Sequence, residues 1–421
     1  MKNFKLIFTA FFGLFFFAVH GQHNLQPDLQ NFRQPGYDGL NVFEAPKLDS
    51  PAFEGLKIRL GADFAMQFQG LSHSTGSSTD TMASIGNNFN LPTANLNLDV
   101  QMAKGVRLHM RTYLSSRHHP EAWVKGGHLQ IDRLDFIKSN FLDNLMDYVT
   151  VRVGLDEINY GDAHFRRTDN ANAIYNPFVG NYIIDGFTTE AFGEVYFRSN
   201  GFLAMVAISN GKLNQSVVKS SDDEDAGPSF YGKLGYDQQL NDDFRFRITG
   251  SFYNNSNDLA NFLYNGDRAS SRYYNVMNTT TGSSGDWSGR NTFTIPQVTS
   301  IMINPFIKYK GLEFFGLYEN ISGQSFGGGD VGYNQIAGEL LYRFGSSEQL
   351  YLGGRYNTVT GTDGNSGRDI NRLNVGGGWF ITNNILAKVE YVDQNYTGDG
   401  WTGQYQDGNF NGFVLEAVIS F

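Results

Sequence analysis

Residues 56–69 read Leu-Lys-Ile-Arg-Leu-Gly-Ala-Asp-Phe-Ala-Met-Gln-Phe-Gln and alternate apolar with mostly polar side chains. Successive side chains of a β-strand point to opposite faces, so Leu56 and Ile58 would share an apolar face opposite Lys57 and Arg59. About ten residues suffice for a tilted strand to cross the hydrocarbon of a bilayer. The stretch is long enough, and it predicts an amphipathic strand that crosses a membrane.

The same alternation recurs along the rest of the chain. It appears, strongly or weakly, in the segments 56–69, 94–102, 106–115, 128–137, 149–155, 186–198, 202–209, 229–237, 244–253, 298–309, 312–319, 335–344, 349–357, 372–380, 385–393 and 411–421. Short links such as 199–201 and 310–311 alternate with long ones such as 156–185 and 254–297. Short periplasmic turns and long extracellular loops are typical of outer-membrane barrels. The sequence therefore predicts an all-β fold, a transmembrane antiparallel β-barrel of about sixteen strands.

The N-terminus has the pattern of a secretory signal peptide. Lys2 and Lys5 precede an apolar run over residues 6–19, and Gly21 occupies a plausible cleavage site. The run is shorter than the roughly 20 residues of a membrane-spanning helix, although an uncleaved anchor is the alternative. The predicted parts of the chain are the signal peptide 1–21, a periplasmic N-terminal extension 22–55 and the barrel 56–421.

Composition agrees with an exported barrel. The chain has 49 Gly, 36 Phe, 22 Tyr and no Cys, so it forms no disulfides. Mean hydropathy is only −0.35, because alternation hides an apolar outer face from any average. Net charge is −10, and it becomes −12 when Lys2 and Lys5 leave with the signal peptide. An acidic exported chain is not expected to bind nucleic acid.

Residues 22–55 are polar and contain four of the 10 prolines, which are Pro27, Pro35, Pro46 and Pro51. This composition predicts an extended periplasmic segment. The alternatives are that it lies inside the lumen, contacts a periplasmic or envelope-complex partner, or is only a mobile tail.

The third long loop, residues 156–185, concentrates charges of both signs. We expect one acidic row and part of a basic row on opposite sides of a pore constriction, where the field between them would orient polar solutes. The acidic candidates are Asp156, Glu157, Asp162, Asp169 and Asp185. The basic candidates are Arg166 and Arg167, with His164 beside them in a hydrogen-bonded loop. The alternative is a surface loop whose charges satisfy one another.

The barrel wall adds basic residues in the polar phase of the predicted strands. They are Arg59, Arg107, Arg111, Arg133 and Arg152. The polar phase faces the lumen if the apolar phase faces lipid. Polar lumen residues occur in any porin, so these arginines do not by themselves indicate anion selectivity.

Catalytic and metal-binding motifs are not evident. His118 and His119 are adjacent and would point apart on a strand, which suits a metal site poorly. The acidic run at residues 222–225 lacks the EF-hand pattern and is more typical of a solvated loop than of a site for a divalent cation. No Gly-x-Ser-x-Gly motif is present. We therefore expect no enzymatic activity, no cofactor and no metal.

The end of the chain, from Phe413 through Leu415, Ala417 and Ile419 to Phe421, resembles the C-terminal assembly signal of outer-membrane proteins. This resemblance implies that the barrel-assembly machinery handles the chain during insertion. It also implies that outer-membrane lipid and lipopolysaccharide surround the inserted barrel.

Two internal stretches are similar to an uncharacterised group of outer-membrane barrels from Bacteroidetes, residues 116–127 and residues 158–178. The Gly21-Gln22 junction and the Asn- and Phe-rich composition also look like that phylum. More loosely, the chain resembles the porin superfamily that includes the phosphate-selective porins, although no motif carries phosphate selectivity across. In sixteen-stranded general porins the third loop folds inward, and by this analogy a homotrimer is expected.

Two functions fit these patterns. The first is a porin-like channel for passive diffusion of small hydrophilic solutes, with residues 156–185 as the constriction. The second is a non-conducting accessory or structural barrel of an assembly or export complex. It would use residues 22–55 or long loops such as 254–297 as partner surfaces. The alternative for these loops is that they are merely mobile. Conductance and a copurifying partner would separate the two.

Overall fold

The computed structural model describes residues 26–114, 122–168, 172–213, 227–257, 259–266, 273–281, 287–363 and 366–421. Helical structure in these ranges is limited to α2 (Asp143–Met146) and three short 3-10 turns. Within the same ranges, no helix is long and apolar enough to cross a membrane.

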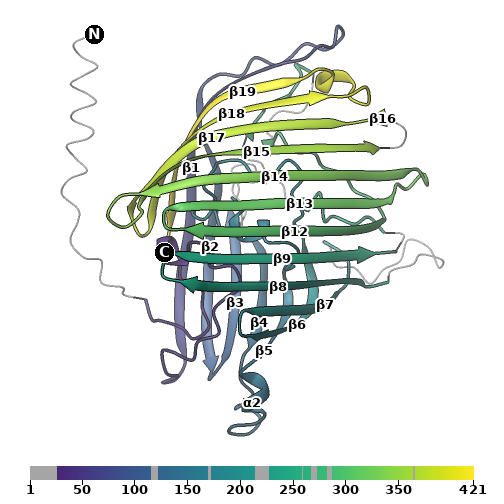
Figure 1. Ribbon diagram of the computed structural model, residues 1–421. Coiled ribbons are helices and arrows are strands. Elements are labelled where there is room, and N and C mark those ends of the chain that lie inside the picture. The colour runs from purple at the N-terminus through teal and green to yellow at the C-terminus, as the bar shows by residue number, and fades with distance from the viewer. Residues whose placement is uncertain are drawn as a thin grey trace, which may run out of the picture.

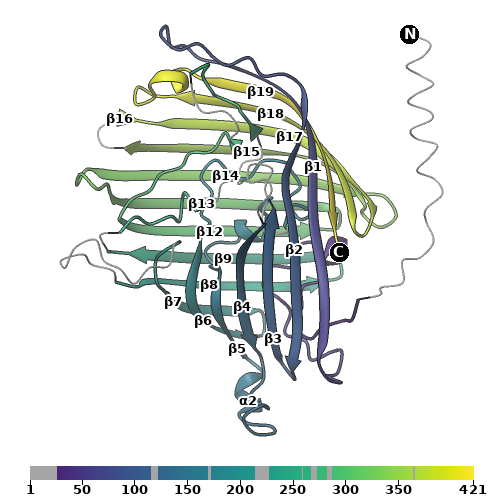
Figure 2. The ribbon, with the colours of Figure 1, turned by 180° about the vertical axis from the view of Figure 1, so that it is seen from behind.

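The protein is a closed antiparallel β-barrel (Figures 1 and 2). Its long strands are β1 (Lys57–Ser74), β2 (Asn88–Ala103), β3 (Val106–Leu114), β4 (Ala122–Ile131), β5 (Val149–Glu157), β6 (Thr189–Ser199), β7 (Phe202–Ser209), β8 (Ser229–Asn241), β9 (Phe244–Asn255), β12 (Gln297–Tyr309), β13 (Leu312–Gln324), β14 (Asp330–Phe344), β15 (Leu350–Asp363), β17 (Asp369–Thr382), β18 (Ile385–Thr397) and β19 (Asn409–Ser420). Each strand pairs with the next, and β19 pairs with β1 from Asp63–Ser420 to Ser74–Asn409. The prediction of a sixteen-stranded barrel is confirmed.

Three shorter strands complete the secondary structure. The two-residue β16 (Ser366–Gly367) extends the hairpin between β15 and β17. The strands β10 (Tyr273–Tyr274) and β11 (Trp287–Ser288) form a small separate sheet within the long connection between β9 and β12.

Side-chain burial along the wall is the inverse of that in a water-soluble sheet. On β14, the apolar Ile336 and Leu340 are more than half exposed, whereas Gln335 and Glu339 are at most 1% exposed. Apolar side chains therefore face outward and polar ones face the lumen, as a barrel surrounded by lipid requires. This alternation is the one that the sequence shows, and it places the chain in the outer membrane.

Aromatic side chains gather where the strands meet the short turns. Phe202 and Tyr236 lie 5.1 Å apart between ring centroids at one such turn, and Phe244 and Tyr309 lie 6.5 Å apart at another. Phe202 and Tyr309 are both more than half exposed. Aromatic girdles of this kind mark the membrane–water interface of transmembrane barrels.

The fourth strand differs from its predicted position. We expected it near residues 128–137, but β4 ends at Ile131 and a periplasmic turn carrying α2 follows. Asp132 begins this turn because its carboxylate accepts hydrogen bonds from Thr150 at 2.5 Å and Lys47 at 3.2 Å. Arg133 therefore lies beyond the wall, where it pairs with Asp49 and Asp147 and does not face the lumen. Its assignment as a wall residue was wrong.

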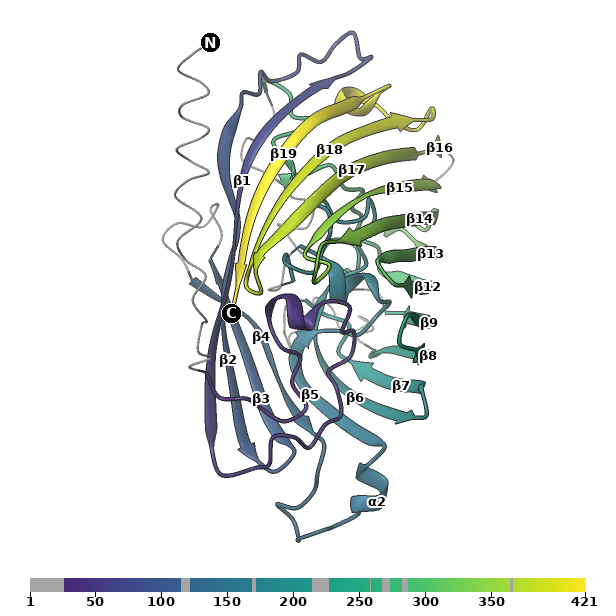
Figure 3. The ribbon, with the colours of Figure 1, turned by 60° about the vertical axis from the view of Figure 1, so that its left-hand side comes forward.

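The N-terminal segment, residues 26–55, enters the periplasmic mouth of the barrel (Figure 3). Its Tyr37 contacts two of the short turns, with the backbone N–H donating to Asn383 O at 2.7 Å and the hydroxyl donating to Ser347 O at 2.7 Å. Phe43 is only 3% exposed. Of the alternatives left open by the sequence, the structure shows the segment inside the lumen.

The outward apolar face gives a prediction for stability. Ile336 lies near the middle of β14, so Ile336→Arg should lower the free energy of unfolding by about 2–4 kcal/mol, because it places a guanidinium in hydrocarbon. The matched control is Gln324→Arg at the extracellular end of β13, which should cost about 0–1 kcal/mol. Equilibrium unfolding of vesicle-embedded protein by urea measures both. Equal losses would contradict the proposed placement in the bilayer.

Candidate functional site

The third loop, which joins β5 to β6, crosses the lumen instead of covering the outer surface. Ile158, Val179, Ile183 and Ile184 on this loop are each at most 2% exposed and belong to one hydrophobic cluster with wall residues. Backbone N–H groups at the far end of the loop donate to side chains of β14, β15 and β18. These contacts are Ile184 to Gln335 at 2.9 Å, Ile183 to Asn357 at 2.8 Å and Val179 to Glu390 at 2.7 Å.

Asp162 anchors the first part of the loop. Its carboxylate accepts hydrogen bonds from Lys233 on β8 at 2.9 Å and from Arg247 on β9 at 2.8 Å. Thr249 donates to it at 2.7 Å. Burial alone would raise the pKa of Asp162, but the cations of Arg247 and Lys233 outweigh burial and hold its pKa well below the usual range.

Gly161 lets the loop approach the wall closely at this anchor. Its φ of +68° lies in the left-handed region, and a Cβ at this position would overlap the side chain of Met302 on β12. Only glycine meets both conditions without strain. The carbonyl of Gly161 also accepts a hydrogen bond from Lys233 at 2.7 Å. The Asn-Tyr-Gly-Asp order therefore places Asp162 against the basic pair.

Arg166 anchors the loop further along the same side of the barrel, beyond β12. Its guanidinium binds Glu313 on β13 at 2.9 Å and Glu339 on β14 at 3.0 Å. The two carboxylates are also held by wall arginines, Arg343 for Glu313 and Arg355 for Glu339. Each charge is buried, so the cluster is stable only because every member has a partner.

The end of the loop is fixed by wall cations that bind backbone carbonyls. Lys388 on β18 donates to the carbonyls of Ala173, Asn176 and Phe178 at 3.0–3.2 Å. Arg372 on β17 donates to the carbonyl of Asn181 at 2.6 Å. This half of the lumen is therefore filled by the loop.

The predicted rows of opposed charge on the two sides of a constriction form only in part. Asp162 and Arg166 bind the wall, and Arg167 binds Asp185 within the loop at 2.6 Å, so these four are anchors and not a row across an open pore. The reason is that each buried charge needs a close partner of opposite sign. Asp169, His118, His119 and the acidic run 222–225 lie outside the described residues.

A second long connection, between β9 and β12, also enters the lumen. Tyr264 donates to Glu319 at 2.8 Å and Tyr273 donates to Glu390 at 2.5 Å. Both tyrosines and Val276 are at most 3% exposed. The described part of this connection is thus interior packing, and our interpretation of it as a partner surface or a mobile loop was wrong for these residues.

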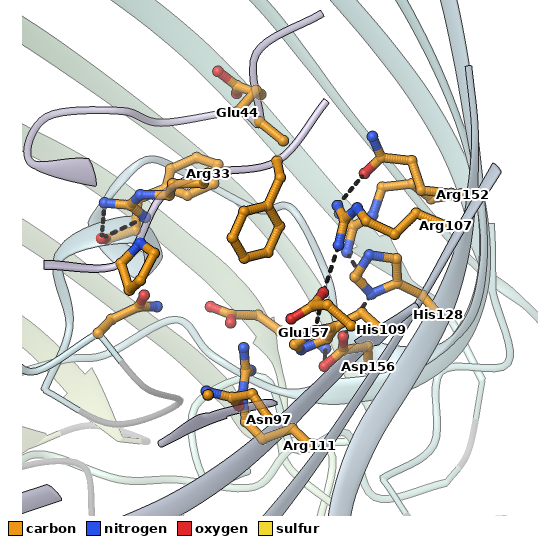
Figure 4. Close-up of a pocket in the computed structure, with 18 of the residues that line it drawn as sticks. Arg33, Glu44, Asn97, Arg107, His109, Arg111, His128, Arg152, Asp156 and Glu157 are labelled. Atoms are coloured by element: carbon orange, nitrogen blue, oxygen red, sulfur yellow. Dashed lines mark hydrogen bonds and ion pairs between the residues drawn. The ribbon is translucent and has the colours of Figure 1, made fainter. Parts of the chain in front are cut away.

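A cavity of about 220 Å³ lies on the side of the lumen that β1 to β6 form. Residues of β1 to β6, the third loop and the N-terminal segment line it. Figure 4 shows Arg33 and Glu44 of the N-terminal segment across from Arg107 and Arg152 of the wall. The predicted residues that line it are Arg59, Arg107, Arg111, Arg152, Asp156, Glu157, His164 and Phe421. Four of the five predicted wall arginines therefore share one cavity with the start of the third loop.

Ion pairs and hydrogen bonds order most of this lining. Arg107 donates to Asp99 at 2.7 Å, and Asp99 also contacts His109 Nδ1 at 3.0 Å. Asp156 lies 2.7 Å from His128 Nδ1, beside Arg152 (Figure 4). Acidic side chains thus lie in contact with basic or imidazole side chains along this lining.

His164 also belongs to this network. It lies 2.8 Å from Glu157 and 2.8 Å from Asn159, which makes it part of a hydrogen-bonded loop as expected. Among the described residues, no group of three or more potential ligands could hold a metal ion.

The N-terminal segment contributes residues that sequence reasoning missed. Arg33 lies over the ring of Tyr175 at 3.7 Å, and Glu44 pairs with Arg247 at 2.8 Å. Burial would raise the pKa of Glu44, but Arg247 and Lys233 hold it at about 2. Nothing in the local sequence marks these residues as lumen contacts, because their partners are about 140–200 positions away.

The partners of the loop could have been found more easily. Glu313, Glu319 and Glu339 occupy the polar phase of two predicted strands, as the five arginines do. Counting acidic as well as basic residues in that phase would have indicated countercharges for an inward loop.

Comparisons with known proteins show the same architecture at low identity. No protein-family model matches the chain, and no curated protein matches it. An anion-selective porin from Comamonas acidovorans aligns with a TM-score of 0.53 at 11% identity, covering 87% of this chain and 100% of that one. OmpT, an outer membrane protein of Vibrio cholerae in its trimer form, aligns with a TM-score of 0.51 at 11% identity, over 87% and 100% of the two chains.

A third solved structure, the outer membrane channel DcaP of Acinetobacter baumannii, aligns with a TM-score of 0.51 at 11% identity, over 87% of this chain and 98% of that one. The closed sheet, the outward apolar face and these likenesses define the class: the chain has the fold of the outer-membrane porins.

The Asp162 anchor gives a prediction. Asp162→Asn should lower the free energy of unfolding by about 3–5 kcal/mol, because it leaves Lys233 and Arg247 buried with less compensation. Thermal unfolding followed by circular dichroism measures the loss. Asp242→Asn, in the exposed turn between β8 and β9, removes the same charge and should change little. A loss no larger than that of the control would mean that the anchor does not hold the loop.

Glu44 gives a prediction about pH. Its pKa is lowered to about 2, so its stabilisation is complete above the ordinary carboxyl pKa of about 4.3 and is lost as the pH falls toward 2. Hydrogen exchange of residues 26–55, corrected for intrinsic rates, should therefore increase between neutral pH and about pH 3. Glu44→Gln should show increased exchange already at neutral pH. Protection that does not change with pH in the wild type would refute the anchor.

Proposed function

We propose that this protein is a narrow porin-like channel for the passive diffusion of small hydrophilic solutes. The observation that carries the proposal is the charged cavity between the third loop and strands β1 to β6. Its volume of about 220 Å³ is below the roughly 300–1,000 Å³ of pockets for drug-sized ligands, which favours small solutes. Solutes would pass along this side, because the loop fills the other side of the lumen.

The third loop is the proposed constriction. Support comes from its ion pairs to strands β8, β9, β13 and β14, which fix its position. His164 of the loop and Asp156 and Glu157 at the end of β5 line the cavity. A constriction held by buried charge pairs keeps a constant width, which suits passive selection by size and charge. The transverse field would come from this lining and not from the anchoring residues Asp162 and Arg166.

A homotrimer is the proposed assembly, supported only by likeness to a barrel that is described in a trimer form. Phe421 remains the proposed assembly signal. It lies just after β19, is half exposed, and exchanges backbone hydrogen bonds with Ala62 of β1 at 3.1–3.2 Å.

The alternative is a non-conducting accessory barrel. The filled half of the lumen favours it, because three segments of the chain occupy space that an open porin leaves to water. These are the N-terminal segment, the third loop and the connection between β9 and β12. A partner that copurifies in stoichiometric amount, together with no conductance, would support this alternative.

Cysteine accessibility tests the pathway directly, since the chain has no native Cys. Asn97 lines the cavity, and Leu96 beside it on β2 faces lipid. Modification of Asn97→Cys by a charged methanethiosulfonate should lower single-channel conductance in a planar bilayer by about half or more, since it narrows the passage. The same treatment of Leu96→Cys should have no effect. Unchanged conductance in modified Asn97→Cys, or no conductance in the wild type, would overturn the proposed pathway.

A further inference from the structure

The turn between β4 and β5 exposes a cluster of apolar side chains. This α2 turn, residues 132–148, projects beyond the periplasmic end of β5 (Figures 1 and 3). Six of its large hydrophobic side chains are each 37–60% exposed, namely Phe136, Ile137, Phe141, Leu142, Leu145 and Tyr148. Single exposed apolar residues are common on proteins, but a cluster of this size in one turn indicates a contact.

The other short turns of the barrel differ from the α2 turn. In the part of the chain that the structure describes, their tips carry polar residues, which are Lys104, Asn200, Asp242, Lys310, Ser346 and Asn383. A turn that faces only water gains nothing from large apolar side chains. The apolar composition is therefore particular to the α2 turn and is not general to the periplasmic turns.

Leu142 occupies a backbone position that does not favour leucine. Its φ of +55° lies in the left-handed region, which Gly and Asn adopt with less strain than bulky residues. Asn140, also left-handed, follows that preference. Leu142 is 49% exposed, so packing within the barrel does not explain its side chain. An apolar side chain at a strained and exposed position points to a contact outside the protein.

Three of the exposed side chains form a row along one side of the turn. The backbone N–H of Leu145 donates to Leu142 O at 2.9 Å, and that of Tyr148 donates to Leu145 O at 3.0 Å. Side chains three residues apart eclipse one another in turns closed by such hydrogen bonds. Leu142, Leu145 and Tyr148 are therefore aligned, and we call them the apolar row. The neighbouring Met146 is only 2% exposed.

The base of the turn is fixed to the rest of the protein. Asp132 is 2% exposed, and its hydrogen bonds from Thr150 and Lys47 hold the start of the turn. Arg133 pairs with Asp147 at 2.6 Å, which joins the two ends of the turn. The turn therefore keeps one direction, with the apolar row outside the barrel.

The apolar row is continuous with the surface that faces lipid. The ring of Tyr148 stacks on Phe197 of β6 with 5.8 Å between centroids. Phe197 is 46% exposed on the outward face of the wall, at the level where aromatic side chains mark the membrane–water interface. The row therefore begins at this interface, where the lipids of the periplasmic leaflet are its nearest surroundings.

The charge of the turn indicates how it would bind lipid. Residues 132–148 contain four acidic and two basic residues, a net charge of −2. Anionic headgroups are not attracted by such a segment, so burial of apolar side chains must supply the interaction.

We propose that the α2 turn is an interfacial membrane anchor whose apolar row inserts among the phospholipids of the periplasmic leaflet. The base of the turn also binds the N-terminal segment, through Lys47 to Asp132 and Asp49 to Arg133. The anchor therefore holds the point where that segment leaves the lumen close to the membrane surface. This role goes beyond the proposed channel and does not depend on conductance.

Site-directed spin labelling tests the position of the row, since the chain has no native Cys. In phosphatidylcholine vesicles, a nitroxide on Leu145→Cys should collide more often with oxygen, which concentrates in lipid, than with a water-soluble nickel chelate. The matched control is the same label on Ser346→Cys, at the exposed tip of another short turn, which should show the reverse. A label on Ile336→Cys, on the outward face of β14, calibrates the hydrocarbon.

A second measurement tests whether the apolar row causes the insertion. A label on Asn144→Cys, at an exposed position, reports on the turn without replacing the row. Leu142→Asn with Leu145→Asn should increase its collisions with the nickel chelate by about threefold or more, because the row no longer favours lipid. Lys138→Ser, at an exposed polar position of the same turn, should change little. Adding phosphatidylglycerol to the vesicles should also change little.

The outcomes distinguish lipid from other occupants of the row. If the label on Leu145→Cys is as accessible to the nickel chelate as that on Ser346→Cys, the inference is overturned and the row is left for a periplasmic protein. Spin–spin broadening at Leu145→Cys that unlabelled protein removes would overturn it in favour of a second copy of this chain. Insertion only in the presence of phosphatidylglycerol would overturn the apolar basis. If the double variant does not fold, the comparison of Leu145→Cys with Ser346→Cys still decides.

Discussion

Closure of the sheet between β1 and β19 is the constraint on which the rest of the structure depends. Once no strand edge remains, every backbone group of the wall is paired, and lipid can cover the outside. Alternate side chains must then point inward whatever their charge. The lumen receives Glu313, Glu339, Lys233, Arg247 and their neighbours together, and the inserted segments follow from the need to pair them.

The lumen charges are paired differently on the two sides of the barrel, and this difference determines which side the third loop fills. On the side of β13 to β18, acids and bases of the wall meet charges and carbonyls of the third loop, so that half is packed. On the side of β1 to β6, the wall pairs largely with itself, as Arg107 does with Asp99. The cavity lies on this second side, where the wall leaves fewer charged side chains for the loop to bind. A single loop thereby both fills one half of the barrel and borders the space in the other half.

The sequence predicts the wall better than the interior, for a physical reason. Alternation is a local pattern, and it identified sixteen strands with one misplaced, β4, whose end depends on the distant Lys47 and Thr150 binding Asp132. The site was foreseen in part, since Arg59, Arg107, Arg111 and Arg152 were assigned to the lumen. The pairing of Asp162 and Arg166 with the wall was not foreseen, because it joins residues 71–173 positions apart. These residues come close together in space only when the barrel closes.

The contacts of the N-terminal segment also have a consequence for the order of assembly. Glu44 binds Arg247 on β9, and Asn41 donates to Glu313 on β13 at 2.8 Å. The segment is therefore made before every strand that holds it, and its binding surface exists only after much of the wall has formed. The earliest described residues of the chain therefore reach their final positions only after the strands that hold them have paired.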